Sequence, residues 1–335
     1  MSDYISLNHG SGGNLTGKLI RNVFAGRFGL TEPLTDSAVL KENGFLLAFT
    51  TDSYVVDPVF FPGGDIGKLA ICGAVNDLAV SGAVPRFISA SFIIEEGFPL
   101  NDLILIADSM SSEAKNAAVK IVTGDTKVVE KGKCDKIFIT TSGIGILQPG
   151  KEQTGTGQRV KPGDKLIING PVGNHAIAVL GARKKLTFNS PVVSDCASLN
   201  HLIHNVLDKC NEIHFMRDLT RGGLATVLNE LAHMTLSGIV INESFVPVEE
   251  PVKGLCEILG FDPLYLANEG KVLFVVGDEE HKKVLDVLRS QPLGLYSEVI
   301  GEVVENNRNM VILNTAIGGR RILDMPSGIQ LPRIC

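Results

Sequence analysis

Five aspartates in the 335-residue sequence stand where their carboxylates could converge on a divalent cation. Mg²⁺ binds one or two carboxylates together with phosphate oxygens, so converging aspartates would form a metal and nucleotide site. Asp52 and Asp125 each follow an apolar run typical of a β-strand. Aspartates also serve as helix N-caps and turn residues, and spacing alone leaves that alternative open. The candidate metal ligands are Asp36, Asp52, Asp77, Asp125 and Asp218.

Glycine clusters accompany these acids at 9–13 (HGSGG), 62–64 (PGG) and 221–223 (RGG). Glycine allows main-chain N–H groups to approach an anion, above all before a helix, although tight turns use glycine as well. Residues 12–18 also fit the phosphate-loop pattern G-x-x-x-x-G-K, but Leu19 follows where a Ser or Thr hydroxyl is needed, and little strand sequence precedes it. We therefore reject a phosphate loop.

Three further residues carry reactive groups. Lys127, close to Asp125, could neutralise phosphate charge, and Glu269, between two apolar runs, could be a base with a raised pKa. Each could equally form a salt bridge or a cap. Cys335 is the last residue, where chain ends are usually exposed, whereas the other five cysteines are expected to pack as small apolar side chains. Arg333 is the cation nearest to this thiol in sequence.

Alternating strand and helix patterns position these residues and predict an α/β or α+β fold. In the first half, strands are expected at 44–52, 87–95 and 136–147, with helices at 65–82 and 101–120. The second half predicts strands at 165–169, 238–241, 272–276, 297–304 and 310–313, with helices at 175–183, 196–207, 221–236 and 278–290. The polar segment at 148–163 has the composition of a linker between domains. We expect domains at 1–150 and 160–315, followed by a flexible tail at 316–335.

The composition and net charge of the chain argue against several classes of function. A chain with 44% hydrophobic residues is not disordered as a whole, and a net charge of −6 argues against nucleic-acid or anionic-membrane binding. No apolar run reaches the length of a membrane span, and no secretory signal opens the sequence, so a cytoplasmic location is expected.

Together the motifs resemble the ATP-binding superfamily of aminoimidazole ribonucleotide synthetase, selenophosphate synthetase and thiamine monophosphate kinase. Within it, the chain is most similar to the hydrogenase maturation protein HypE family. The resemblance spans essentially the whole chain, and its terminal cysteine motif is the most specific part. It rests on HGSGG (9–13), TDSYVVDPVFFPGG (51–64), GKLAICGAVNDLAVSGAVPR (67–86), TGDTKVV (123–129), RDLTRGG (217–223), ANEGK (267–271) and PRIC (332–335).

The resemblance implies ATP-dependent dehydration of a carboxamide carried on Cys335 to a thiocyanate, which supplies the cyanide ligands of nickel-iron hydrogenase. ATP and Mg²⁺ are the implied cofactors, Lys127 would stabilise transferred charge, and Glu269 would be the base. The implied partners are a HypF-like carbamoyltransferase and a HypC–HypD-like iron-carrying complex. The implied nucleotide-binding residues are His9, Gly10, Ser11, Gly12, Gly13, Asp52, Asn76, Asp77, Gly124, Asp125, Thr126, Arg221, Gly222 and Gly223.

The implied fold has two domains. A four-stranded N-terminal sheet would pair with that of a second subunit, forming a barrel across a homodimer, beside a C-terminal α/β domain. Two alternatives remain open. Another amide- or selenide-phosphorylating enzyme of the superfamily would keep the aspartates without using Cys335. A thiol carrier would need Cys335 without the aspartates.

Overall fold

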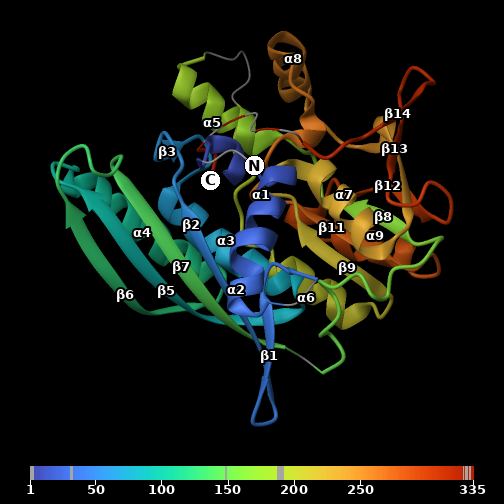
Figure 1. The fold of residues 1–335 in the computed structure, drawn as a ribbon, viewed down its shortest axis with the longest axis horizontal. Coiled ribbons are helices and arrows are strands. Elements are labelled where there is room, and N and C mark those ends of the chain that lie inside the picture. Colours follow the sequence, from blue (N-terminus) through green and yellow to red (C-terminus); the bar gives the residue numbers. More distant parts are fainter. Residues whose placement is uncertain are drawn as a thin grey trace.

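The chain folds around two β-sheets with a central helix between them (Figure 1). The computed structural model describes residues 4–30, 33–147, 149–186, 192–326, 328, 331 and 333–335. The central helix, α3 (Ile66–Val80), contacts strands of both sheets. It therefore joins the first half of the chain to the second.

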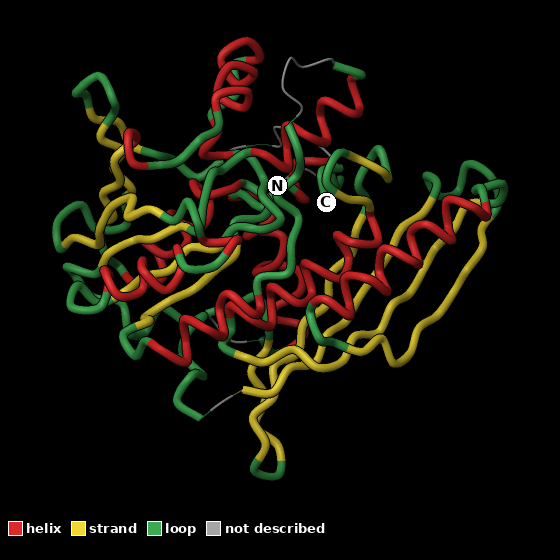
Figure 2. Tube along the Cα trace, turned by 180° about the vertical axis from the view of Figure 1, so that it is seen from behind, coloured by secondary structure: helices red, strands yellow, loops and turns green. Residues whose placement is uncertain are grey.

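The first sheet has five strands in the order β1-β2-β7-β5-β6, and only β5 and β6 pair in parallel. Helices α3 and α4 (Leu100–Asn116) cover one face of it, as the view from behind shows (Figure 2). A short hairpin of β3 (Phe60–Phe61) and β4 (Gly64–Asp65) precedes α3. The sheet strands are β1 (Ala38–Glu42), β2 (Phe45–Tyr54), β5 (Ala83–Glu95), β6 (Lys120–Val129) and β7 (Ile137–Leu147).

The other face of the first sheet carries apolar side chains that nothing in the described chain covers. Phe49 on β2 pairs with Ile144 on β7, which pairs with Phe87 on β5, and all three are exposed. Soluble proteins seldom leave a contiguous apolar row open to water. This open face consists of Phe45, Phe49, Phe87, Ile93, Ile144 and Ile146.

The second sheet is mixed, with seven strands in the order β14-β13-β10-β12-β8-β11-β9. Strand β11 is apolar throughout because both its faces are buried: Leu273 and Val275 pack into one core cluster and Phe274 into another. The strands are β8 (Lys165–Ile168), β9 (Ile213–Asp218), β10 (Gly238–Asn242), β11 (Val272–Val276), β12 (Glu298–Val304), β13 (Val311–Asn314) and β14 (Arg320–Ile322).

Helices pack against both faces of this sheet. Helix α7 (Gly223–Thr235) shares one core cluster with the strands, while α6 (Asn200–Lys209) and α9 (His281–Arg289) share the other. Among the described residues, no helix has the length and apolar character needed to cross a membrane. The remaining helical segments are α1 (Asn14–Leu19), the π-helix η2 (Ile20–Ala25), α2 (Gly26–Phe28), α5 (Asn174–Lys184), α8 (Glu250–Leu259) and the 3₁₀ turns η1 (Leu7–Gly10), η3 (Glu243–Phe245), η4 (Pro263–Tyr265) and η5 (Pro292–Gly294).

Helix α3 forms where the sequence predicts it, and its composition explains its central place. Asp65 caps its N-terminus by accepting hydrogen bonds from the N–H groups of Gly67 (2.7 Å) and Lys68 (3.2 Å). Small apolar residues occur all round the helix, and such helices are buried on every side. Close packing on both sides brings its one acid, the half-buried Asp77, to the contact between the two halves.

The structure departs from the sequence-based expectations in several elements. Asp125 was expected to follow a β-strand, but the whole segment 120–129 is the edge strand β6, and a Cβ at Gly124 would meet the Ala90 carbonyl oxygen at 2.1 Å. Gly124 therefore permits close strand pairing and does not form a turn. The first sheet has five strands instead of four, and a strand, β14, lies within the segment expected as a tail. Elements β1, β9, α1 and α8 were not predicted from the sequence.

Gly124→Ala should weaken the pairing of β6, because the added methyl group meets main-chain atoms of β5 that cannot move independently. We expect a loss of about 1–3 kcal/mol in the free energy of unfolding, measured by urea denaturation. The matched control is Thr123→Ala, an exposed neighbour on the same strand. Equal losses in the two variants would contradict this account.

Candidate active site around a carboxylate cluster and Cys335

Three carboxylates from separate elements form the first part of the candidate site. Asp36 precedes β1, Asp77 lies in α3, and Asp218 ends β9, yet one oxygen of each lies within 4.8 Å of the others. The Thr50 hydroxyl donates to Asp77 Oδ2 (2.6 Å) and also lies 3.0 Å from the main-chain oxygen of Asp36. Both halves of the chain therefore build this carboxylate cluster. It brings together three of the five aspartates that the sequence analysis named as candidate metal ligands.

The carboxylate cluster contains more negative than positive charge. Burial raises the pKa of Asp36, Asp77 and Asp218, and repulsion from neighbouring carboxylates raises those of Asp77 and Asp218 further. The opposing cation is Arg217, whose Nε lies 3.3 Å from Asp36 Oδ2 and whose Nη1 lies 2.7 Å from Glu230. One guanidinium shared with a fourth carboxylate leaves a charge deficit that a hard divalent cation with oxygen ligands would fill.

The terminal thiol forms the second part of the site. Cys335 lines a cavity of about 110 Å³, and Arg221 Nη1 lies 3.8 Å from its Sγ. Burial raises the pKa of Cys335 to about 12, although Arg221 opposes the shift. Arg221, and not Arg333, is therefore the cation beside the thiol. The cavity is also lined by Gly10, Ser11, Val55, Ala176, Gly222, Tyr265, Leu266, Ala267, Pro326, Gly328, Leu331, Arg333 and Ile334.

Glu269 interacts electrostatically both with the carboxylate cluster, through Asp218, and with Arg221 beside the thiol. It is buried, and its Oε1 has no hydrogen-bond partner in the described structure. Burial is the main cause of its strongly raised pKa, and repulsion from Asp218 and Asp195 adds to it, while Arg221 lowers it. A buried carboxyl without a partner, coupled to both the metal candidates and the thiol's arginine, has the properties of a general base.

Tyr54 belongs to the same site, although the sequence did not single it out. Its hydroxyl donates to Asp52 Oδ2 at 3.4 Å, and Gly73 in α3 leaves room for it, since a Cβ there would meet the hydroxyl at 2.1 Å. Burial, with repulsion from carboxylates and from Cys335, raises the pKa of Tyr54 well above its usual value. The available signal was its place two residues after Asp52, on the same face of β2.

Two of the three glycine clusters, at 9–13 and 221–223, come together next to the thiol. A Cβ on Gly12 would meet the Arg221 main chain at 2.8 Å, and one on Gly13 would meet the Pro326 carbonyl oxygen at 2.3 Å. Gly222 and Gly223 both have positive φ where the chain enters α7. Residues 9–13 and 221–223 therefore meet in space, while His9 itself bonds only locally, to Ser6.

Other predicted site residues lie elsewhere in the single chain. Asp125 and Lys127 are exposed on edge strand β6, with Gly124 and Thr126, and pair with each other (Nζ to Oδ2, 2.7 Å). Asn76 faces neither solvent nor the carboxylate cluster: it is buried, with its amide bonded to the main chain of Ala197 and Leu199.

Four cysteines are buried as expected. The prediction for Cys134 was wrong, because this residue is half-exposed.

Comparison with known proteins extends these observations. Residues 34–147 match the family model of the AIR synthase related protein N-terminal domain, and residues 161–314 match that of its C-terminal domain. The chain is 50% identical to carbamoyl dehydratase HypE of Rhodobacter capsulatus, over 99% of this chain and 98% of that one. It is 45% identical to carbamoyl dehydratase HypE of Escherichia coli, over 99% of each. The chain belongs to the HypE family.

Solved HypE structures share the whole fold. A HypE–HypF complex superposes with a TM-score of 0.86 at 49% identity, covering 92% of this chain and 99% of that one. HypE in complex with ATP superposes with a TM-score of 0.84 at 44% identity, covering 99% and 100%. The two-domain α/β fold is therefore that of the AIR synthase related proteins, and the protein is a HypE-type enzyme of hydrogenase maturation.

The carboxylate cluster generates a prediction about metal and pH. Without divalent cations, Asp77→Asn should raise the free energy of unfolding by about 1 kcal/mol near neutral pH, because it removes one of several repelling carboxylates. Carboxyl groups with raised pKa values stabilise the fold at low pH and lose that contribution as pH rises through those values. The advantage of Asp77→Asn should therefore grow as pH rises.

Mg²⁺ should reverse the order, stabilising wild type and leaving Asp77→Asn almost unchanged, as measured by thermal unfolding with and without the cation. Asp108→Asn, at an exposed position on α4, removes the same charge away from the carboxylate cluster and is the control. Equal Mg²⁺-dependent shifts in all three proteins would exclude this metal site.

Proposed function

We propose that this protein uses ATP to dehydrate a carboxamide carried on Cys335, giving a protein-bound thiocyanate for the cyanide ligands of nickel-iron hydrogenase. One observation carries the proposal. The thiol of the last residue lies in a cavity beside Arg221, and Arg221 is coupled electrostatically to Glu269. Substrate carrier, candidate base and carboxylate cluster therefore belong to one charge network.

The chemistry needs a leaving group and a proton acceptor. The carboxamide oxygen attacks the terminal phosphorus of ATP and ADP leaves, so a poor leaving group becomes a phosphate. Loss of both N–H protons and of that phosphate then converts S–C(=O)NH₂ to S–C≡N. In its ionised form, Glu269 would be an unusually basic carboxylate for taking an N–H proton, because burial raises its pKa. Arg221 would orient the group attached to Sγ.

Asp36, Asp77 and Asp218 would hold Mg²⁺, with Asp52 nearby, and residues 9–13 and 221–223 would offer main-chain N–H groups to the phosphates. Bound Mg²⁺ would neutralise phosphate charge. Support comes from the charge deficit of the carboxylate cluster and from the relative solved in complex with ATP. The cavity of about 110 Å³ suits a carboxamide and not a nucleotide, which would lie on the carboxylate-cluster side.

Two other functions fit the observations less well. An enzyme phosphorylating a free amide or selenide would have no reason to place its terminal cysteine beside Arg221. A thiol carrier without catalysis would not need a cluster of three buried or half-buried carboxylates with raised pKa values. The two features together favour a protein that carries its own substrate.

The open face supports a homodimer. Its apolar row resembles half of an interface, and closing it against a second copy would complete the barrel expected from the family. Strand β6 lies at the edge of this sheet, so Asp125 and Lys127 would approach the partner's phosphates and act across the interface. A HypF-like carbamoyl donor is supported by the complex of a relative, and a HypC–HypD-like complex is the proposed acceptor.

Glu269→Gln should separate loading from dehydration. Gln keeps the size but cannot accept a proton, so thiocyanate formation on preloaded protein should slow by about 100-fold or more while the carboxamide still accumulates. The measurement is the mass of the C-terminal peptide over time after ATP addition, and Cys335→Ala, which carries no group, is the control. Wild-type rates in Glu269→Gln would remove Glu269 from the mechanism.

Mixed dimers test whether Asp125 acts across the interface. Asp77→Asn and Asp125→Asn homodimers should each be nearly inactive. A mixed dimer would contain one site without either substitution and should recover up to about half of the wild-type activity, as the symmetry of a two-site dimer requires. ATP turnover of the mixed and unmixed proteins is the measurement. Failure of mixing to restore activity would place Asp125 in its own chain's site or outside any site.

A further inference from the structure

The last three residues lie antiparallel to residues 55–57, and a main-chain oxygen of each accepts a hydrogen bond. The N–H of Val55 donates to Cys335 O (3.0 Å), and the N–H of Asp57 donates to Arg333 O (3.2 Å). His175 Nε2 lies 2.7 Å from Ile334 O. Since a carbonyl only accepts, Nε2 carries the proton, and Nδ1 accepts from the Ser194 hydroxyl at 2.8 Å.

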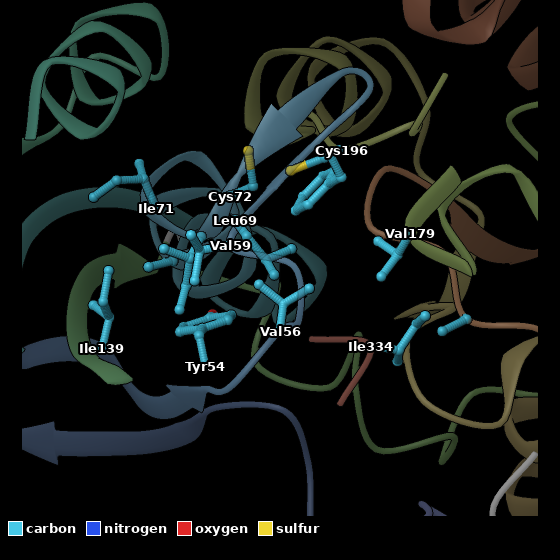
Figure 3. Close-up of a cluster of buried hydrophobic side chains, with 14 of the residues drawn as sticks. Tyr54, Val56, Val59, Leu69, Ile71, Cys72, Ile139, Val179, Cys196 and Ile334 are labelled. Carbon is cyan, nitrogen blue, oxygen red and sulfur yellow. The ribbon is translucent and has the colours of Figure 1, made fainter. Parts of the chain in front are cut away.

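The side chain between these contacts is an apolar anchor. Ile334 is buried in the core cluster that contains Val56 and Val179, and the three lie near one another in Figure 3. Burial lowers the pKa of His175 and so favours the neutral ring. These contacts use only main-chain oxygens and the Ile334 side chain. They therefore hold the tail whatever group is attached to the Cys335 thiol.

Arg333 makes the contacts that distinguish this tail from any other extended segment. Its Nε donates to Val55 O (3.0 Å), and its guanidinium pairs with Asp135. Arg183 donates to Arg333 O (2.6 Å) and through Nε to Asp57 O (2.7 Å). Two arginines from distant parts of the chain therefore tie the tail to the 55–57 segment and to the turn before β7.

The backbone of Arg333 is held in an unfavourable conformation. Its φ is +54°, the left-handed region that non-glycine residues rarely adopt outside strongly determined sites. A free tail would relax from it, so the docked state depends on the contacts that oppose this cost. These contacts lie two residues from the thiol, and the Arg333 and Asp135 side chains are both partly exposed to solvent.

We propose that Asp135, Arg183 and Arg333 form a latch that sets how long Cys335 stays beside Arg221. The three are positioning residues, because they act through the tail and touch no reacting atom. This inference rests on the proposed function in one respect: the reaction gives the reason why the protein would hold Cys335 in its cavity. It deepens that function by naming what the tail must break before Cys335 can reach a macromolecular donor or acceptor.

Alkylation of Cys335 tests the latch without ATP or a carbamoyl donor. The full-length protein is treated with iodoacetamide, labelling of the C-terminal peptide is followed by mass spectrometry, and glutathione in the same reaction is the reference thiol. Asp135→Asn and Arg183→Lys should label Cys335 roughly three- to tenfold faster than wild type, because a charge-assisted contact is lost. Asp135→Glu should retain most of the protection.

Glu130→Gln is the matched control, since Glu130 is an exposed acid in the segment between β6 and β7 and no ion pair joins it to the described residues of the tail. A double-substitution cycle adds specificity. Asp135→Asn combined with Arg333→Gln should label no faster than Arg333→Gln alone, because both remove the same pair. Multiplicative effects, or equal labelling in wild type and Asp135→Asn, would overturn the latch.

The latch and the proposed function can fail separately. Faster labelling in the latch variants of a protein whose wild type never forms thiocyanate would support the latch and reject the function. In an active protein, latch variants should slow dehydration of preloaded Cys335 while speeding its loading by the donor. A purely structural defect would slow both steps and would overturn the proposal.

Discussion

The site depends on negative charge that the protein buries without enough positive charge to match it. Asp36, Asp77 and Asp218 meet at the contact between the two halves, and Glu269 is buried close enough for Asp218 to raise its pKa. Arg217 and Arg221 each offset part of this charge. Burial and mutual repulsion raise the pKa values of these carboxyl groups, and a cation bound among them would lower those values. A divalent cation neutralising Asp218 would therefore lower the pKa of Glu269 and ionise the base when the nucleotide is in place.

Burial among negatively charged groups also determines the state of the Cys335 thiol in its cavity. With a pKa of about 12, Cys335 in its cavity is a thiol at physiological pH, so it is a poor nucleophile there. Docking is favoured below the ordinary pKa of a cysteine and weakens as pH rises from that value towards 12. Under the proposed function, loading the thiol and processing the loaded group would therefore take place at different positions of the tail. A short segment held by main-chain hydrogen bonds, one buried isoleucine and surface arginine contacts could move between them, and it would withdraw Ile334 from the core cluster that contains Val56 and Val179.

Much of the fold could be predicted from the sequence, because periodicity reports burial. The continuous apolar run at 272–276 and the small-residue helix 66–80 are examples. The apolar run before Asp125 indicated only the start of strand β6, because an exposed edge strand has no alternating pattern and the close contact of Gly124 with Ala90 has no local signal. Asp36, Asp77 and Asp218 were predicted as metal ligands, but their convergence depends on packing across the two halves. His175 and Arg217 act through contacts with Ile334 and Asp36, which are far away in sequence and which no local pattern encodes.

The central claim is that the site buries more negative charge than its arginines neutralise. Proton release on nucleotide binding tests this claim most directly. Isothermal titration calorimetry of Mg²⁺ with a non-hydrolysable ATP analogue, repeated in buffers of different ionisation enthalpy, counts the protons exchanged with solvent. The account predicts net release, because the carboxylate cluster and Glu269 give up protons when the cation neutralises their surroundings, and a smaller release from Glu269→Gln. Binding without proton release, or equal release from both proteins, would show that the buried charge is already balanced and would contradict the account.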